Sequence, residues 1–257
     1  MKQSTQAAFR KLMCYLGDFW FFCRDSFYWL VRPPFRYKLF IDQFNAIGVD
    51  SIPIIVLVSV FTGMVFALQT TYAFRLFSAE TLVGSTVGLS LSREIAPVFA
   101  ALMITARVGS GIAAELGTMR VTEQIDALES MAVYPHQYLV VPRVFTAMIM
   151  VPLHTVIFNF VGILGAYFVG VVLLEIPSGP FLQRLYQFVD PKDVVGGVIK
   201  AAFFGFLLGS ISCFEGFRTK HGARGVGIST TRAVVLSSVC ILVADYFLTQ
   251  IILEVVK

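Results

Sequence analysis

The order of apolar and polar positions divides the 257-residue chain into long runs with few charges. A helix that crosses a bilayer needs about 20 mainly apolar residues, because each residue rises about 1.5 Å and the hydrocarbon core is about 30 Å thick. Five runs meet this requirement: 52–71, 95–114, 144–174, 194–214 and 233–253. Alternating stretches of about 10 residues, the pattern of barrel strands, are not seen. The pattern predicts an all-α integral membrane protein with five transmembrane helices.

Composition and charge add an orientation to this picture. The chain is 57% hydrophobic and 14% charged, with a mean hydropathy of +0.78, which excludes an ordinary soluble domain. Basic residues are retained on the cytoplasmic side of a membrane. Segments 1–51, 115–143 and 215–232 hold 13 of the 20 Lys and Arg residues, and the segments that alternate with them hold five. We therefore expect a cytoplasmic amino terminus and a periplasmic carboxyl terminus.

The amino-terminal segment, residues 6–47, mixes aromatic and basic side chains. Its apolar stretches are too short to span, and Asp18 and the Pro33-Pro34 pair interrupt them. Rings in the acyl boundary and cations at the headgroups suit a helix that lies along the membrane surface. A secretory signal peptide is the weaker interpretation, because no small-residue cleavage site is evident. The domains expected are therefore interfacial helices over 1–51 and a five-span unit over 52–257.

Three charges lie within the runs, Arg107, Lys200 and Asp245, and such charges are costly in lipid unless they have a partner or a polar environment. Arg107 and Asp245 could pair with each other. Small residues four apart mark two packing faces, Gly197, Ala201, Gly205 and Gly209 on one run and Gly162, Ala166 and Gly170 on another. The cysteines, Cys14, Cys23, Cys213 and Cys240, lack metal-ligand spacing and are expected to be unpaired.

The stretch between the first two runs, residues 72–94, has no room for a separate soluble domain and should lie at the outer membrane surface. Phe74 and Phe77 offer apolar walls, and Arg93 beside Glu94 offers a cation. A ligand with acyl tails and a phosphate needs both. By itself, an Arg-Glu pair is more often a local anchor at a helix start.

Catalytic motifs are absent from the sequence. The phosphate-binding pattern G-x-x-x-x-G-K-[ST] does not occur, and neither does the G-x-S-x-G motif that surrounds a nucleophilic serine. The three histidines lack metal-ligand spacing, and His154 is expected to be a packing residue that forms a hydrogen bond. The chain is therefore predicted not to be an enzyme and to hold no metal or cofactor.

The segment 115–143 contains a predicted short helix. Val121, Ile125 and Leu128 recur at helical spacing, while Glu123, Asp126 and Glu129 follow another face. Three acids and one base, Arg120, suit anionic lipid poorly, whereas an apolar ridge with acidic flanks suits a groove on a protein partner.

The chain from about residue 40 to its end resembles the MlaE/YrbE family of ABC-transporter permeases. The most specific strings are AAELGTM and TEQIDAL, within the stretch REIAPVFAALMITARVGSGIAAELGTMRVTEQIDALESMAV, and GISTTRAVVLSSVCILVADYFLT nearer the carboxyl end. The amino-terminal segment matches in character more than in detail.

The resemblance implies the protein's partners. Members are homodimers in the bacterial inner membrane, bound to a separate cytoplasmic ABC ATPase that holds ATP and Mg²⁺. They also act with a periplasmic MCE-domain protein and often with a STAS-domain protein. The cargo in the best-known branch is phospholipid moved between the inner and outer membranes, which maintains outer-membrane lipid asymmetry. No nucleic acid is implied.

The resemblance also implies two sets of site residues. Residues 118–131 match the helix that couples to the ATPase, and its named positions are Thr118, Arg120, Glu123, Ile125, Asp126, Leu128 and Glu129. The lipid cavity of the family matches Phe66, Phe74, Phe77, Arg93, Glu94 and Ile95, with Arg93 expected at the phosphate.

Two other function classes compete with a lipid permease. A membrane scaffold would anchor a partner complex without showing lipid-stimulated ATP hydrolysis. A secondary transporter using Arg107 and Asp245 would be driven by an ion gradient, but five spans without an inverted repeat argue against it.

Overall fold

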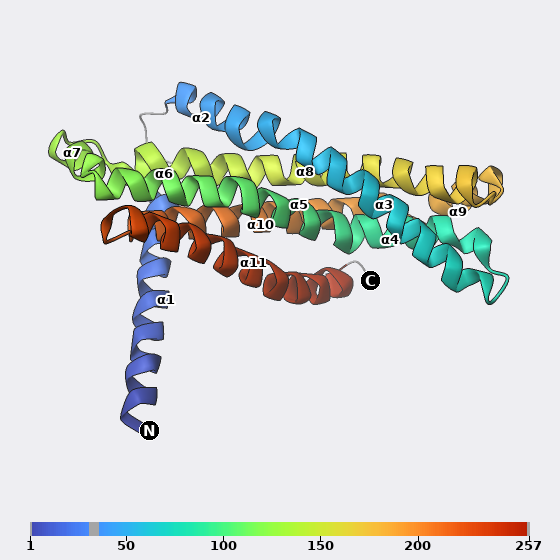
Figure 1. Cartoon of the computed structure of the whole chain (residues 1–257), viewed down its shortest axis with the longest axis horizontal. Coiled ribbons are helices and arrows are strands. Elements are labelled where there is room, and N and C mark those ends of the chain that lie inside the picture. Colours follow the sequence, from blue (N-terminus) through green and yellow to red (C-terminus); the bar gives the residue numbers. More distant parts are fainter. Residues whose placement is uncertain (1, 31–35, 256–257) are drawn as a thin grey trace.

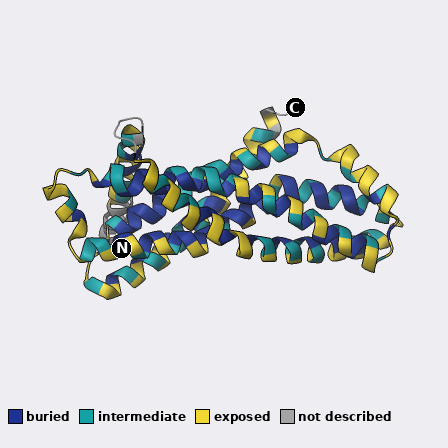
Figure 2. Ribbon diagram, turned by 90° about the horizontal axis from the view of Figure 1, so that it is seen from above, coloured by how far each residue is buried: buried dark blue, intermediate teal, exposed yellow. Residues whose placement is uncertain are grey.

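The computed structural model describes residues 2–30 and 36–255, and every regular element within them is a helix. The helices run along the long axis of an elongated bundle, with α7 (Gln124–Ser130) at one end and α9 (Ser178–Phe188) at the other (Figure 1). These are called below the α7 end and the α9 end. Buried residues follow the interior of the bundle along its length, whereas its loops are largely exposed (Figure 2).

Five helical segments in the described residues are long and apolar enough to cross a membrane, and the predicted fold class is confirmed. These segments are Tyr37–Arg75, Glu80–Val121, His136–Leu173, Pro191–Phe217 and Gly222–Ile252. They comprise α2 (Tyr37–Gln43), η1 (Phe44–Gly48), η2 (Val49–Ser51) and α3 (Ile52–Arg75); η3 (Glu80–Leu82), α4 (Val83–Ser90), η4 (Leu91–Ile95), α5 (Ala96–Ile104), η5 (Thr105–Gly109) and α6 (Ser110–Val121); η6 (His136–Val140), α8 (Val141–Tyr167) and η7 (Phe168–Leu173); α10 (Pro191–Phe217); and α11 (Gly222–Val255).

The second segment begins earlier than the sequence predicted. Helix continues from Glu80, so Arg93 and Glu94 lie inside a membrane-length helix and not in a loop before it. The expectation that 72–94 is a surface connection is therefore wrong for most of its length. The charges of Arg93 and Glu94 predicted a helix boundary here. Both residues instead belong to η4, a π-helical turn that joins α4 to α5 without a break.

The turn η4 changes which face of the helix is buried. The buried apolar side chains here are four apart, at Val83 and Val87 of α4 and at Leu91 of η4, and the next, Ala96 of α5, follows after five. Four-residue steps then resume at Ala100 and Ile104. In an uninterrupted α-helix the buried face would have continued through positions 95 and 99, so the extra residue of the π turn directs Ile95 and Phe99 away from that core.

Close backbone contacts join the central helices, as the small-residue faces predicted. Gly63 of α3 faces the carbonyl of Gly162 in α8, and Gly205 of α10 faces the carbonyl of Ala147, so closely that a methyl group at either glycine would overlap the facing carbonyl. Nearby, His154 Nε2 donates to the carbonyl of Gly48 at 3.0 Å, which agrees with its predicted packing role. All four cysteines are free, as expected.

The amino-terminal helix α1 (Lys2–Leu30) lies across the bundle at the α7 end (Figure 1). Phe22 is buried and packs edge-on against Phe214 of α10, with ring centroids 5.4 Å apart, and Trp29 stacks on Tyr134 at 4.3 Å. Other aromatics of α1, such as Trp20, are exposed. This crosswise position supports the interfacial interpretation, which stays a prediction. The expected break at Pro33 and Pro34 lies outside the described residues.

Candidate functional site

An open groove of about 400 Å³ runs between α3 and α5. Five residues of α3 form one wall, and Ile95 of η4 and Phe99 of α5 form the other; the α3 residues are Phe61, Thr62, Val65, Phe66 and Gln69. Phe99 packs behind the groove on Phe158 of α8, with centroids 6.3 Å apart. Thr62 and Gln69 are the polar members of this lining, so the groove suits a hydrocarbon chain better than a charged ligand.

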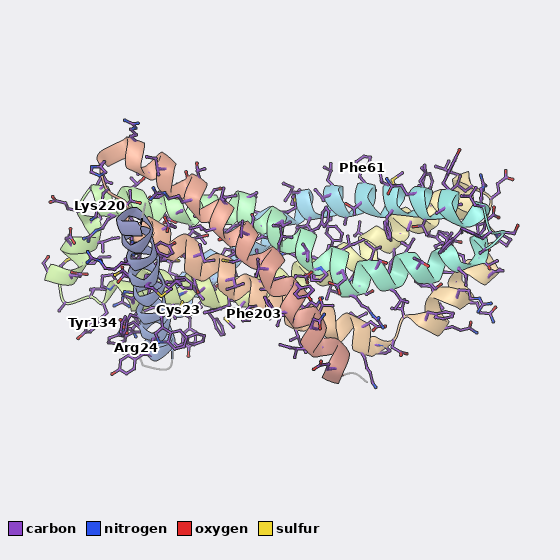
Figure 3. The ribbon with its side chains drawn as sticks, turned by 90° about the horizontal axis from the view of Figure 1, so that it is seen from below. Cys23, Arg24, Phe61, Tyr134, Phe203 and Lys220 are labelled. Carbon is purple, nitrogen blue, oxygen red and sulfur yellow. The ribbon has the colours of Figure 1, made fainter. Side chains whose placement is uncertain are left out.

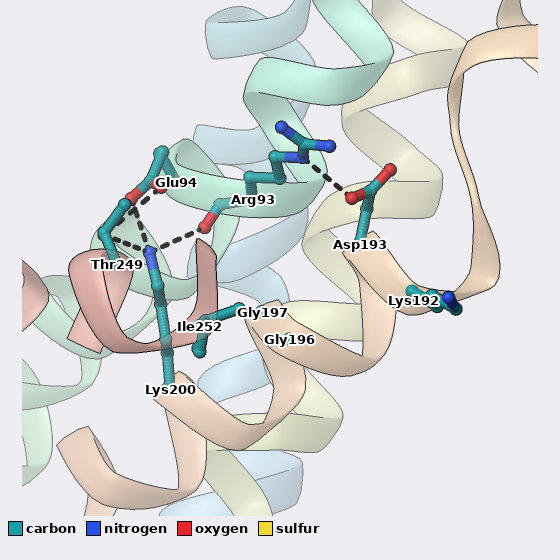
Figure 4. A pocket seen from close by; sticks show the side chains of 9 residues that line it. All are labelled: Arg93, Glu94, Lys192, Asp193, Gly196, Gly197, Lys200, Thr249 and Ile252. Atoms are coloured by element: carbon teal, nitrogen blue, oxygen red, sulfur yellow. Dashed lines mark hydrogen bonds and ion pairs between the residues drawn. The ribbon is translucent and has the colours of Figure 1, made fainter. Parts of the chain in front are cut away.

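Two of the six predicted lipid contacts, Phe66 and Ile95, lie in this groove. Phe74 packs against the core, and Phe77 lies in the turn after α3 with 78% of its surface exposed. Arg93 and Glu94 instead line a separate pocket, together with residues of α10 and α11 (Figure 4).

Five groove residues were not among the predicted lipid contacts: Phe61, Thr62, Val65, Gln69 and Phe99. Their signal was spacing: positions 61, 65 and 69, with 62 and 66, share one face of α3, and Phe99 follows Ile95 by four.

A buried ionic cluster lies where η4, α10 and α11 meet (Figure 4). Lys200 of α10 is at its centre, with only 3% of its side chain exposed. Its Nζ has four acceptors within hydrogen-bond distance for its three N–H groups: Glu94 Oε2 at 2.6 Å, Asp245 Oδ1 at 3.2 Å, Thr249 Oγ1 at 2.6 Å and the carbonyl of Arg93 at 3.1 Å. One ammonium group thus holds two carboxylates from two other helices. A buried charge is tolerated only with such partners.

Arg93 extends from the same turn in another direction. Its Nε donates to Asp193 Oδ1 at 2.8 Å, and Asp193 also accepts from the backbone N–H of Asp190 at the start of α10. This pairing attaches η4 to the first turn of α10. The Arg93 side chain keeps 44% of its surface exposed.

Arg107 and Asp245 do not pair with each other, so that suggestion is wrong. Asp245 binds Lys200, whereas Arg107 Nη1 donates to Ser51 Oγ at 2.6 Å and to the carbonyl of Ala46 at 3.2 Å. Arg107 lies in η5, and its side chain reaches η1 and η2, just before α3. The sequence alone could not show that Arg107 and Asp245 have different partners, because each partner lies far away along the chain.

The segment 115–143 begins and ends at one ion pair. Glu115 Oε1 of α6 lies 2.7 Å from Arg143 Nη2 of α8, and Arg143 is buried. Between these two residues, the single helix predicted over 118–131 is divided. Glu123 adopts a left-handed conformation, φ 60°, which ends α6, and α7 then starts at Gln124. Thr118 and Arg120 belong to α6.

The apolar side of α7 faces this chain's own bundle. Ile125 is buried, Leu128 packs against the core, and Arg120 forms an ion pair with Asp126 across the break. Glu123 and Glu129 are exposed. The predicted apolar ridge is therefore occupied, and the surface of α7 that remains accessible is acidic.

Membrane-length helices with a lateral apolar groove and an ionic cluster between helices define a multi-pass membrane protein. The profile of the family described as Permease MlaE matches residues 40–251. The chain therefore belongs to this family, and it is a transmembrane permease of the ABC transporter class.

Three relatives illustrate the range of the similarity. A probable ABC transporter permease protein of Rickettsia conorii is 44% identical over 93% of both chains. The intermembrane phospholipid transport system permease protein MlaE of Haemophilus influenzae is 38% identical over 86% of this chain and 85% of its own. The chloroplastic protein TRIGALACTOSYLDIACYLGLYCEROL 1 of Arabidopsis thaliana is 33% identical over 86% of this chain and 63% of its own.

Proposed function

We propose that the chain is the membrane subunit of an ABC transporter that moves phospholipid between the bacterial inner membrane and a periplasmic MCE-domain partner, and so helps to maintain outer-membrane lipid asymmetry. The observation that carries this proposal is the α3–α5 groove, because its lining accepts an acyl chain from the side of the bundle. The name of the Haemophilus influenzae relative supports phospholipid as the cargo.

The groove suggests how two copies would act together. It is open along its side, and Phe61 and Val65 are more than half exposed beside it. A second copy placed against this face would enclose the groove, which fits the expected homodimer. In this proposal the acyl contacts are Phe66, Ile95 and the five newly found residues, while Arg93 and Glu94 fix the helices behind the groove.

The acyl site is tested by Phe66→Ala combined with Phe99→Ala. Losing both rings removes most of the aromatic wall, so phospholipid that copurifies with the full chain is expected to fall severalfold, as measured by mass spectrometry. Phe203→Ala on α10 is the matched control, because Phe203 is a half-exposed aromatic that does not line the groove (Figure 3). Equal lipid retention by the double variant and the control would disprove the acyl site.

The ATPase is proposed to dock at the α7 end, which we expect to face the cytoplasm together with the amino terminus because basic residues are retained on that side. ATP and Mg²⁺ would then bind in that separate subunit. The accessible surface of α7 carries Glu123 and Glu129, so we propose a basic docking surface on the ATPase.

Charge reversal tests this docking surface. Glu129→Lys is expected to weaken copurification of the ATPase at least severalfold, because a like charge would then face the basic partner. Glu175→Lys, an exposed acid on the loop before α9, is the control and should leave copurification unchanged. Undiminished ATPase binding by Glu129→Lys would show that the acidic surface of α7 is not part of the interface.

A membrane scaffold remains the alternative function. Reconstituted complex separates the two, since a transporter shows lipid-stimulated ATP hydrolysis and a scaffold does not. Copurification of the tagged chain would at the same time identify the MCE-domain partner and any STAS-domain protein. The ion-coupled alternative has lost its support, because Arg107 and Asp245 are engaged at separate places.

A further inference from the structure

A second and larger cavity, of about 740 Å³, lies at the α7 end between α1, the end of α6 and the turn that joins α10 to α11. We call it the basic pocket. Its wall includes the apolar side chains Phe214, Phe217 and Ile228, and four cations line it: Arg120, Arg218, Lys220 and Arg232. Figure 3 shows Lys220 at the same end of the bundle as α1. The pocket is separate from the α3–α5 groove in position and in lining.

The two carboxylates of the basic pocket are already engaged. Asp18 of α1 pairs with Arg218 at 2.8 Å. Glu215 of α10 accepts a hydrogen bond from the Tyr15 hydroxyl at 2.6 Å. Burial, together with Glu215, raises the pKa of Tyr15, so the phenol stays protonated as the donor.

Two of the four cations have no partner in the part of the chain that the structure describes. Arg120 pairs with Asp126, and Arg218 with Asp18, whereas Lys220 and Arg232 are exposed and form no ion pair or side-chain hydrogen bond with any described residue. The net charge of the lining, four cations against two carboxylates, is therefore concentrated in these two side chains.

The backbone that carries Lys220 and Arg232 is held firmly. Thr219 donates a hydrogen bond to Ser229 Oγ at 2.9 Å, which ties the turn to α11. Gly225 packs against the carbonyl of Lys220 so closely that a side chain at 225 would overlap it. Gly225, Ile228, Ser229 and Arg232 then share one face of α11 that lines the pocket. The two cations are thus presented by a preformed wall.

Cations next to an apolar wall, in a cavity beside a helix that lies across the bundle, match a ligand with a phosphate and a hydrocarbon part. We propose that the basic pocket binds the headgroup of an anionic phospholipid from the leaflet at the α7 end, with its phosphate on Lys220 and Arg232 and its first acyl carbons on Phe217 and Ile228. This site is additional to the transport groove, and it holds or fails independently of the cargo.

The test uses the full chain reconstituted in phosphatidylcholine with a minor fraction of phosphatidylglycerol, followed by mass spectrometry of the lipid retained after detergent extraction. Lys220→Gln with Arg232→Gln is expected to reduce retained phosphatidylglycerol about tenfold or more, since each basic side chain near an anionic headgroup contributes to binding. Arg224→Gln is the matched control, because Arg224 is an exposed cation of α11 that does not line the basic pocket. An equal loss of phosphatidylglycerol in the control would show that retention depends on surface charge in general, and would overturn the proposal.

Further measurements identify the source of the phosphate and check the fold. Ile228→Asn should also lower phosphatidylglycerol retention. Displacement of the lipid by inorganic phosphate would mean that a free anion is the ligand, and would overturn the lipid assignment. Loss of the ATPase from the Lys220 and Arg232 variant with phosphatidylglycerol retention unchanged would overturn it too, in favour of a protein partner.

The thermal unfolding temperature of that variant should equal the wild-type value, because both side chains are exposed. Phe66→Ala with Phe99→Ala should lower the total phospholipid retained but leave the fractional loss of phosphatidylglycerol caused by Lys220→Gln with Arg232→Gln unchanged, which separates the basic pocket from the groove.

Discussion

Replacing Lys200 by methionine is expected to lower the free energy of unfolding by up to about 3–5 kcal/mol, the range found when one partner of a fully buried ion pair is removed. The carboxylates left behind, Glu94 and Asp245, keep 40% and 20% of their side chains exposed, so the loss should lie toward the lower end of that range. Methionine nearly keeps the length of the side chain but removes the ammonium group. Glu94 and Asp245 would then face each other without their shared cation, and Thr249 would lose its strongest partner. Because these residues come from η4, α10 and α11, the contact between three segments should loosen together. Denaturant or thermal unfolding of the purified chain in detergent measures the loss.

Lys192→Met provides the control for this prediction. Lys192 lines the same pocket as Lys200 but is exposed, so its replacement should change the free energy of unfolding by less than about 0.5 kcal/mol. Combining Lys200→Met with Glu94→Gln and Asp245→Asn should recover part of the lost stability, because no unpaired charge remains. If Lys200→Met were as stable as Lys192→Met, the cluster would not stabilise the bundle.

Gly63→Ala is expected to destabilise the bundle by about 1–3 kcal/mol, the usual cost of extra volume in a packed core. The added methyl group would meet the backbone carbonyl of Gly162, which cannot rotate away as a side chain can, so α3 and α8 would have to separate. That separation would also move the α3 wall of the groove. Thermal unfolding and lipid retention should therefore both decline.

Gly111→Ala makes the same chemical change in a different environment. Gly111 lies within α6 and has open space where a methyl group would be placed. Alanine is favoured over glycine inside a helix, so this variant should gain about 0.5–1 kcal/mol. The two substitutions thus have opposite predicted signs. A loss of stability for both would show that the cost lies in the helix backbone and not in the contact between α3 and α8.

Much of the fold followed from the sequence because lipid imposes strong constraints. Length and hydropathy were sufficient to count five spans, and glycine spacing was sufficient to locate close helix contacts. The boundary of the second span was missed because Arg93 and Glu94 are costly in lipid, and nothing local indicated that Lys200 and Asp193 would compensate them. Pairing between segments about 100 residues apart depends on tertiary structure.

The candidate site was predicted only in part for a related reason. Of the predicted lipid contacts, Phe66 and Ile95 line the groove, whereas Phe74 and Phe77, which were grouped with them by nearness in sequence, do not. A groove between two helices is lined by residues four apart on each helix, so a contiguous stretch is a poor guide to it. Similarly, the periodicity of α7 showed an apolar face without showing that this face is buried against its own chain.

Which side chains face the groove depends on the number of residues in the π turn η4. Deleting one residue from Leu91–Ile95 would restore an uninterrupted α-helix and rotate one half of the segment by about 100° relative to the other. The side chains now at 95 and 99 would no longer face the groove, although every amino acid lining it had been kept. Among relatives of this chain, a single-residue gap at η4 would therefore change the ligand-facing surface more than many substitutions within it.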